Sequence, residues 1–192
     1  MTAIRLSSLE DPRLIDLVNE GAIGVIPTDT VYGLVGKAGS QDAIERMYSV
    51  KSRERQPGTT IAASVEQLEQ LGFPPSQLQR ASPYWPDALS VEMSATAIPR
   101  YISTGQPVMA ARVPNKTALL DLMEITGPLM TTSANAPKQP TATSIKMAMD
   151  YFGDEVDFYV DGGDLSGRPP STIIGFDGSG EIIVYRQGAV SI

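Results

Sequence analysis

Apolar residues recur along the chain with two spacings, one typical of helices and the other of strands. Between residues 9 and 20, Leu14, Leu17 and Val18 are spaced so that they share one face of a helix. Similar apolar stripes predict further helices over 40–50, 64–71, 74–85, 115–125 and 144–152. Short apolar or alternating runs predict strands over 22–26, 60–63, 89–93, 107–113, 129–132, 156–160, 171–176 and 181–186.

Several of these helices begin or end at residues that favour helix termini. Ser64 and Gln67 have the spacing of a capping box, in which each side chain satisfies a free backbone donor of the first turn. Asn115 is expected to cap the helix that follows it. Gly127 and Gly153 are expected to end their helices, because glycine tolerates the backbone conformation found there.

The order of the predicted elements indicates the fold class. Helices and strands alternate, which favours an α/β fold, whereas the short connections between the last strands indicate antiparallel pairing. No repeat, low-complexity tract or long linker divides the chain. We therefore expect residues 1–192 to form a single domain, with a twisted, mixed β-sheet layered with helices.

Composition narrows the chemistry. The chain has 192 residues, of which 42% are hydrophobic and 19% charged, as in a globular domain with a core of its own. It has no cysteine and no histidine. Disulfides, Cys- or His-ligated metals and a Ser-His-Asp triad are therefore excluded. A metal could bind only through oxygen, which favours Mg²⁺ carried by a substrate over a tightly bound cofactor.

Charge and hydropathy indicate where the protein acts. Its 15 basic and 22 acidic residues give a net charge of −7, which disfavours broad non-specific nucleic-acid binding. A local basic groove is still compatible with Lys51, Arg53 and Arg55, although these side chains could simply be a solvated helix end. No apolar run approaches the roughly 20 residues of a membrane span, and no signal peptide is recognised. We expect a cytoplasmic protein without membrane contact.

The segment 127–135, Gly-Pro-Leu-Met-Thr-Thr-Ser-Ala-Asn, is the most distinctive stretch of the chain. An apolar strand ends there in small hydroxyl and amide side chains. Such compact donors and acceptors at a sheet edge can grip phosphates, carboxylates and ribose hydroxyls. The alternative is an ordinary strand-to-loop junction in which Ser133 and Asn135 cap turns.

Two further places have similar alternatives. Thr28, Asp29 and Thr30 follow a short strand and could line a pocket for a small amino acid, or Asp29 could bond its own turn. Arg112 ends a predicted buried strand and needs an anionic partner there. That partner could be a bound ligand, or an aspartate or glutamate in a structural ion pair.

Five pieces in this order resemble the YrdC-like family of threonylcarbamoyl-AMP synthases. They are Pro-Thr-Asp-Thr-Val-Tyr-Gly at 27–33, Lys-Ser-Arg at 51–53, Arg-Val-Pro at 112–114, Thr-Ser-Ala-Asn at 132–135, and Pro-Ser-Thr at 170–172 with Arg-Gln-Gly at 186–188. The resemblance runs from about 21 to 188. It implies an open sheet with a large concave face.

The resemblance also implies an activity. The family consists of nucleotidyltransferases that form threonylcarbamoyl-AMP and pyrophosphate from L-threonine, bicarbonate and ATP. The product passes to a downstream threonylcarbamoyl transferase that modifies adenosine in tRNA. Threonine's own amine captures carbon dioxide, so no protein nucleophile is needed, and the protein positions reactants and neutralises charge.

Site residues follow from the resemblance position by position. Lys51 and Arg53 are expected to be catalytic and to bind ATP. The expected threonine-binding residues are Thr30, Tyr32, Arg112, Thr131 and Ser171. The expected nucleotide-binding residues are Lys51, Arg53, Ser133, Asn135, Thr141 and Arg186.

The chain departs from the family pattern in several loops. Glu54 replaces the usual proline after Lys-x-Arg, 62–64 is Ala-Ala-Ser where many members have histidine, 87–90 is Asp-Ala-Leu-Ser where Gly-Pro-x-Thr is common, and Pro137-Lys138 replaces Ser-Gly. One alternative function is a non-catalytic relative that binds nucleotide or double-stranded RNA. Another is a carbamoyl-phosphate-handling transferase domain, although the zinc-finger-like cysteines of those longer proteins are missing.

Overall fold

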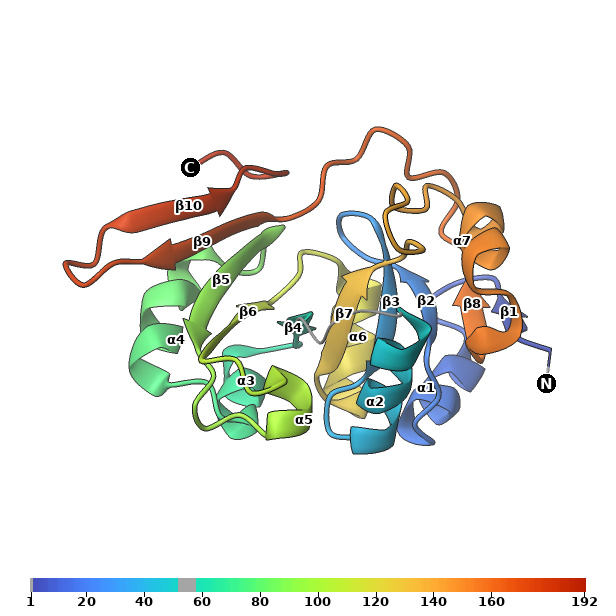
Figure 1. Cartoon of the computed structure of the whole chain (residues 1–192), viewed down its shortest axis with the longest axis horizontal. Coiled ribbons are helices and arrows are strands. Elements are labelled where there is room, and N and C mark those ends of the chain that lie inside the picture. Colours follow the sequence, from blue (N-terminus) through green and yellow to red (C-terminus); the bar gives the residue numbers. More distant parts are fainter. Residues whose placement is uncertain (1, 52–57) are drawn as a thin grey trace.

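A computed structural model of the chain describes residues 2–51 and 58–192. Within these residues ten strands form one sheet, in the order β1-β8-β2-β3-β7-β4-β6-β5-β9-β10 (Figure 1). The strands are β1 (Ile4–Leu6), β2 (Gly24–Pro27), β3 (Tyr32–Lys37), β4 (Thr59–Ile61), β5 (Leu89–Ser94), β6 (Val108–Arg112), β7 (Leu129–Ser133), β8 (Phe158–Val160), β9 (Thr172–Phe176) and β10 (Ile182–Arg186).

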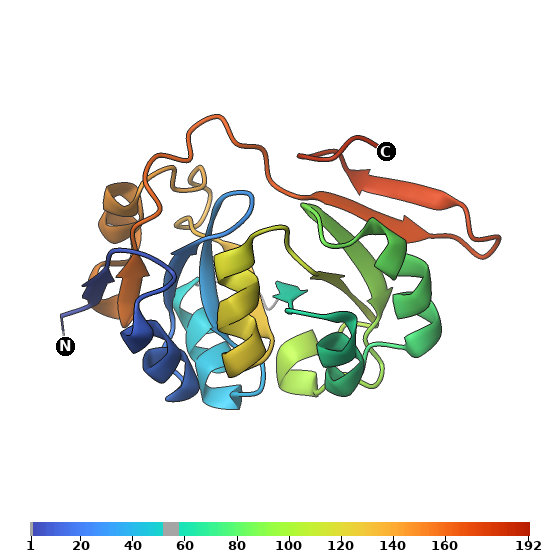
Figure 2. The same cartoon turned by 180° about the vertical axis from the view of Figure 1, so that it is seen from behind.

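The sheet is mixed and does not close. Strand β8 pairs in parallel with β1 and β2, and parallel pairs also join β4 to β6 and β5 to β9. The remaining pairs are antiparallel, including the hairpin of β9 and β10. Strands β1 and β10 form the two edges, and both views show them at opposite ends of the molecule (Figures 1 and 2). The predicted mixed α/β sheet is confirmed.

The helices lie on both faces of the sheet. They are α1 (Pro12–Asn19), α2 (Gln41–Val50), α3 (Val65–Leu71), α4 (Pro75–Ala81), α5 (Arg100–Ser103), α6 (Thr117–Thr126) and α7 (Ile145–Phe152), with short 3₁₀ turns at Ser82–Tyr84 and Gly153–Glu155. In the described residues, no helix has both the length and the apolar character needed to cross a membrane.

The buried apolar residues beneath these helices form two cores. Helices α1 and α6 pack over one face against β1, β2, β3, β4, β7 and β8 (Figure 2). The larger core contains buried residues of α2, α3, α4, α5 and α7 on the other face. Among the described residues, none from β5, β6, β9 or β10 belongs to the α1–α6 core. That part of the sheet therefore has an uncovered face, which agrees with the expected open concave surface.

Arg112 lies on this open face. It pairs in register with Ile61 of β4, and Ile61 belongs to the α1–α6 core. Residues paired across adjacent strands point to the same side of a sheet, so Arg112 faces the same side where α6 no longer covers it. The sheet thus changes from a covered to an open surface between β4 and β6.

Some predicted elements differ from the structure. Strand β3 was not predicted from the sequence; it contains Gly33 and Gly36, and glycines are depleted in strands. Tertiary packing explains these glycines: a Cβ at Gly33 would lie 2.5 Å from the Thr131 Oγ1, and one at Gly36 would lie 2.8 Å from the Met47 sulfur. Strand β1 and helix α5 were also not predicted from the sequence.

The structure confirms some of the predicted helix ends and contradicts others. Ser64 accepts from the Gln67 backbone N–H, as the capping box predicted, whereas the Gln67 side-chain oxygen accepts from the backbone N–H of Ala63. Asn115 was wrong as a cap: the N-cap position of α6 is Lys116, without a side-chain capping bond. The backbone N–H of Asn115 instead donates to the Asp29 carboxylate. The backbone of Asn115 is thus held by a tertiary contact, one residue before the N-cap position of α6.

Candidate active site

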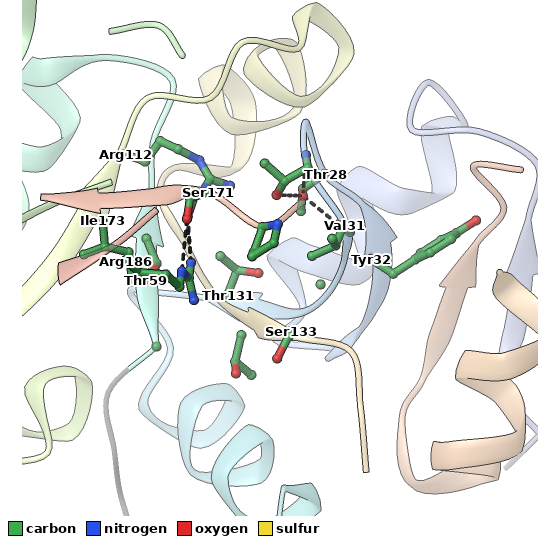
Figure 3. Close-up of a pocket in the computed structure, with 15 residues that line it drawn as sticks. Thr28, Val31, Tyr32, Thr59, Arg112, Thr131, Ser133, Ser171, Ile173 and Arg186 are labelled. Carbon is green, nitrogen blue, oxygen red and sulfur yellow. Dashed lines mark hydrogen bonds between the residues drawn. The ribbon is translucent and has the colours of Figure 1, made fainter. Parts of the chain in front are cut away.

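A cavity of about 390 Å³ lies where the open face meets the ends of β3, β4, β6 and β7 (Figure 3). The linker 161–171 passes from β8 to β9 and contributes its last two residues to the wall. The lining consists mainly of hydroxyl side chains and arginines, and it comprises Thr28, Thr30, Val31, Tyr32, Gly33, Gly58, Thr59, Arg112, Thr131, Thr132, Ser133, Pro170, Ser171, Ile173 and Arg186.

Arg112, at the end of β6, forms an ion pair with Asp29 across a distance of 2.9 Å. The two side chains are only 4% and 3% exposed. Burial lowers the pKa of Arg112, and the Asp29 carboxylate opposes that shift. Arg112 Nη1 also donates to the Ser90 hydroxyl at 3.3 Å. The sequence raised two partners for Arg112, an acidic side chain and an anionic ligand. Both are compatible with the structure, because Arg112 pairs with Asp29 and also lines the cavity.

Ser171 and Arg186 form the adjoining part of the wall. The Arg186 guanidinium donates to the Ser171 carbonyl at 2.8 and 3.1 Å and to the Ser171 hydroxyl at 3.1 Å (Figure 3). The Ser171 and Ser90 hydroxyl oxygens are 3.1 Å apart. Burial lowers the pKa of Arg186. A continuous set of contacts thus joins Arg112 to Arg186 through two serines.

Threonine side chains face these arginines. Thr28 and Thr30 lie 3.1 Å apart through their hydroxyl oxygens, and the Thr28 hydroxyl also donates to the Val31 carbonyl at 2.6 Å. Thr131 of β7 is buried beside them and lines the cavity. Lys116 donates to the carbonyls of Pro27 and Thr28, which fixes this loop against the start of α6. The hydroxyl-lined pocket predicted from the sequence is present.

Lys51 has a different environment. It is 2% exposed, and its ammonium donates to the Ser133 carbonyl at 2.7 Å and to the Asn135 carbonyl and side-chain oxygen at 2.7 and 2.8 Å. The Ser133 hydroxyl donates to the same Asn135 oxygen. Asn135 donates in turn to Ala136 and Gln139. Lys51 and Asn135 therefore fasten the loop after β7, and of these three residues only Ser133 lines the cavity.

Three predicted site residues are placed differently from the rest. Tyr32 is among the lining residues, but its ring is buried in the core and points away from the cavity, with its hydroxyl bonded to Gly162 and Gly163 (Figure 3). Thr141 is half-buried and is absent from the lining. Arg53 lies outside the described residues.

Sequence reasoning missed Ser90 and Lys116 and did not foresee the pairing of Asp29 with Arg112. Ser90 stands at the last position of the 87–90 segment, where the family commonly has threonine, so a hydroxyl at that point was a usable signal. The pairing of Asp29 with Arg112 left no signal in the sequence, because the two residues are 83 positions apart. Within the described residues, no group of three acidic side chains could hold a metal ion.

Comparison with known proteins identifies the family. The model of the family Sua5_yciO_yrdC, described as Telomere recombination, matches residues 16–188. The chain belongs to the Sua5/YciO/YrdC family. That match spans strands β2 to β10, the cavity and every predicted site residue, so the resemblance seen in the motifs is confirmed.

Individual family members are similar over most of the chain. A threonylcarbamoyl-AMP synthase from Pseudomonas aeruginosa is 30% identical over 171 residues, which cover 87% of this chain and 92% of that protein. A threonylcarbamoyl-AMP synthase from Pyrococcus abyssi is 32% identical over 162 residues, covering 82% of this chain and 48% of that protein. The chain thus spans about half the length of the Pyrococcus relative.

A solved structure extends the comparison to three dimensions. The crystal structure of Pyrococcus abyssi Sua5 in complex with L-threonine superposes with a TM-score of 0.83 at 28% identity, covering 98% of this chain and 58% of that one. The fold of this Sua5/YciO/YrdC chain is therefore the fold of that protein's matching part.

Proposed function

We propose that this chain is a threonylcarbamoyl-AMP synthase, which converts L-threonine, bicarbonate and ATP into threonylcarbamoyl-AMP and pyrophosphate. The observation that carries the proposal is one cavity in which Arg112, Ser171 and Arg186 face a wall of threonine hydroxyls. The relatives named for this activity and the threonine complex of a family member support it.

The cavity offers partners for each part of the amino acid. A threonine carboxylate needs a cationic donor, and Arg112 is the buried cation of the wall. The ammonium and hydroxyl of threonine need hydrogen-bond partners once they leave water. Thr28, Thr30 and Thr131 supply these partners. Arg186 and Ser133 extend the polar lining toward the phosphates of ATP. Mg²⁺ enters this scheme with ATP, as part of the substrate.

The reaction needs no nucleophile from the protein. Bicarbonate takes up a proton and loses water to give carbon dioxide. The amine nitrogen of threonine then bonds to the carbon of this carbon dioxide and releases a proton. A carbamate oxygen then bonds to the α-phosphorus of ATP, while the bond from that phosphorus to the bridging oxygen of the β-phosphate breaks and pyrophosphate leaves. The protein holds the reactants together and stabilises the negative charge, which accounts for a site built from arginines and hydroxyls.

Incubation of the pure protein with Mg-ATP, bicarbonate and labelled threonine tests the proposal. We expect pyrophosphate and a labelled adenylate that both depend on threonine. Arg112→Ala is the inactive control. ATP cleavage that ignores threonine, or turnover that requires tRNA, would contradict the proposed mechanism, because the adenylate forms before tRNA is engaged.

We propose that the product serves tRNA modification through a downstream threonylcarbamoyl transferase, and that the reaction takes place in the cytoplasm, where both ATP and tRNA are present. With a net charge of −7, the protein should bind RNA weakly and with strong salt dependence. Tight RNA binding at physiological salt without pyrophosphate release would instead favour a non-catalytic RNA-binding relative.

A further inference from the structure

A fully buried hydroxyl, that of Ser90, lies between the two arginines of the cavity. Strand β5 places it there, because β5 pairs with β6, which ends in Arg112, and with β9, which directly follows Ser171. Ser90 is 0% exposed, and its oxygen lies 3.3 Å from Arg112 Nη1 and 3.1 Å from the Ser171 oxygen. Ser90 itself is absent from the cavity lining.

The partners of Ser90 decide which way its proton points. Arg112 has only donors, so the Ser90 oxygen accepts from it. Ser90 is buried, and among the described residues its one remaining contact is the Ser171 hydroxyl. A buried hydroxyl proton needs an acceptor, so Ser90 donates to Ser171.

The same reasoning then fixes the direction of the Ser171 hydroxyl proton. Its oxygen accepts one bond from Ser90 and one from Arg186 Nη2, which occupies both lone pairs. Its own proton has no acceptor among its contacts in the described residues, and Ser171 lines the cavity. The proton of Ser171 is thus left to donate to an oxygen that enters the cavity.

We propose that Ser90 is a positioning residue that turns the Ser171 hydroxyl into a donor for the bound anionic group of the substrate. This inference rests on the proposed synthase function. The orienting group is the Ser90 hydroxyl, which itself touches no substrate. Ser90 also joins Arg112 to Arg186, so it ties the cation proposed for threonine to the cation proposed for ATP.

Threonine affinity and threonine-dependent pyrophosphate release in five variants test this inference. Ser90→Ala is expected to weaken threonine binding about tenfold, as for a lost hydrogen bond to a charged group, and to lower kcat/KM in parallel. Ser90→Thr keeps the hydroxyl and should restore both values to within about threefold of the unchanged protein. Ser94→Ala, which removes a hydroxyl of the same strand outside the cavity lining, should change neither.

A double variant separates positioning from general packing. If Ser90 acts through Ser171, the variant with both serines replaced by alanine should be no weaker than Ser171→Ala alone. Losses that multiply, or a Ser90→Thr protein as weak as Ser90→Ala, would overturn the inference. Thermal unfolding of each variant confirms that the comparison is made on folded protein.

The outcomes distinguish the two proposals. If the unchanged protein is active and Ser90→Ala equals it, only the positioning role fails. If the unchanged protein binds threonine without releasing pyrophosphate, the synthase function fails and the threonine affinities still decide the role of Ser90. If it binds no threonine, both proposals are overturned.

Discussion

The Lys51 side and the Arg112 side of the site use their cations differently. Lys51 is absent from the cavity lining, and its ammonium donates to three oxygens of Ser133 and Asn135. Arg112 and Arg186 lie in the wall itself and reach each other through two serine hydroxyls. An ammonium has three donors, whereas a guanidinium has five in a planar fork. The arginines can therefore hold the protein and still face a ligand.

This difference predicts that the two sides respond differently to substitution. Loss of the lysine should loosen a loop that both substrates need. Loss of Arg186 should leave the fold unchanged and lower the affinity for a ligand. Arg112 combines both roles, because its buried ion pair and its place in the wall depend on the same side chain.

The largest effect is expected for Arg112→Ala. Its removal leaves the Asp29 carboxylate buried without its cation, which should lower the free energy of unfolding by about 3–5 kcal/mol. Threonine-dependent turnover should be lost as well. Urea denaturation and pyrophosphate release measure the two effects.

A double variant separates these two consequences of Arg112→Ala. Adding Asp29→Asn removes the unpaired charge, so part of the stability should return while turnover stays absent. Recovery of turnover in the double variant would show that Arg112 is only a structural partner of Asp29.

The next largest effect is expected for Lys51→Met. Two buried oxygens of Asn135 and the part-buried Ser133 carbonyl lose a donor, which should lower the free energy of unfolding by about 1–3 kcal/mol. Because the loop carrying Ser133 is displaced, the affinities for threonine and ATP should fall together in separate titrations.

The sequence motif alone predicts the opposite pattern, in which Lys51 grips phosphate and only ATP affinity falls. A loss restricted to ATP, with unchanged stability, would therefore favour direct contact with phosphate. Asn135→Ala is the matched partner: if the lysine acts through the loop, its effect on stability should not add to that of Lys51→Met.

A smaller effect is expected for Arg186→Ala. This residue is on edge strand β10 and is only partly buried, so the free energy of unfolding should change by less than about 0.5 kcal/mol. ATP affinity should fall about tenfold, as for one charge-assisted hydrogen bond. Lys146→Ala, an exposed cation on α7, is the control, and an equal loss of ATP affinity there would indicate only a general charge effect.

The smallest effect is expected for Tyr32→Phe. The hydroxyl bonds to Gly162 and Gly163, and its loss should cost about 1 kcal/mol in unfolding free energy. Threonine affinity, measured by calorimetry, should stay unchanged because the ring points away from the cavity. A tenfold weaker affinity would instead support the sequence-based role of Tyr32 at the threonine end.

The sequence by itself determined the class of chemistry and most of the elements. The absence of histidine and cysteine excluded whole classes of catalyst, since no other side chain replaces an imidazole or a thiolate. Apolar spacing located the helices 40–50 and 144–152 and the strand at 129–132, because such patterns are local. The motifs at 27–33 and 132–135 indicated the family from residue identity alone.

Tertiary structure decided which side chains meet. Strand β3 forms because it pairs with β2 and β7, in spite of two glycines that favour a turn. Arg112 pairs with Asp29, which lies 83 positions away in the sequence, and Lys51 donates to Asn135, which lies 84 positions away. Buried donors and acceptors must find partners wherever the fold brings them, and that requirement cannot be read from neighbours in the chain.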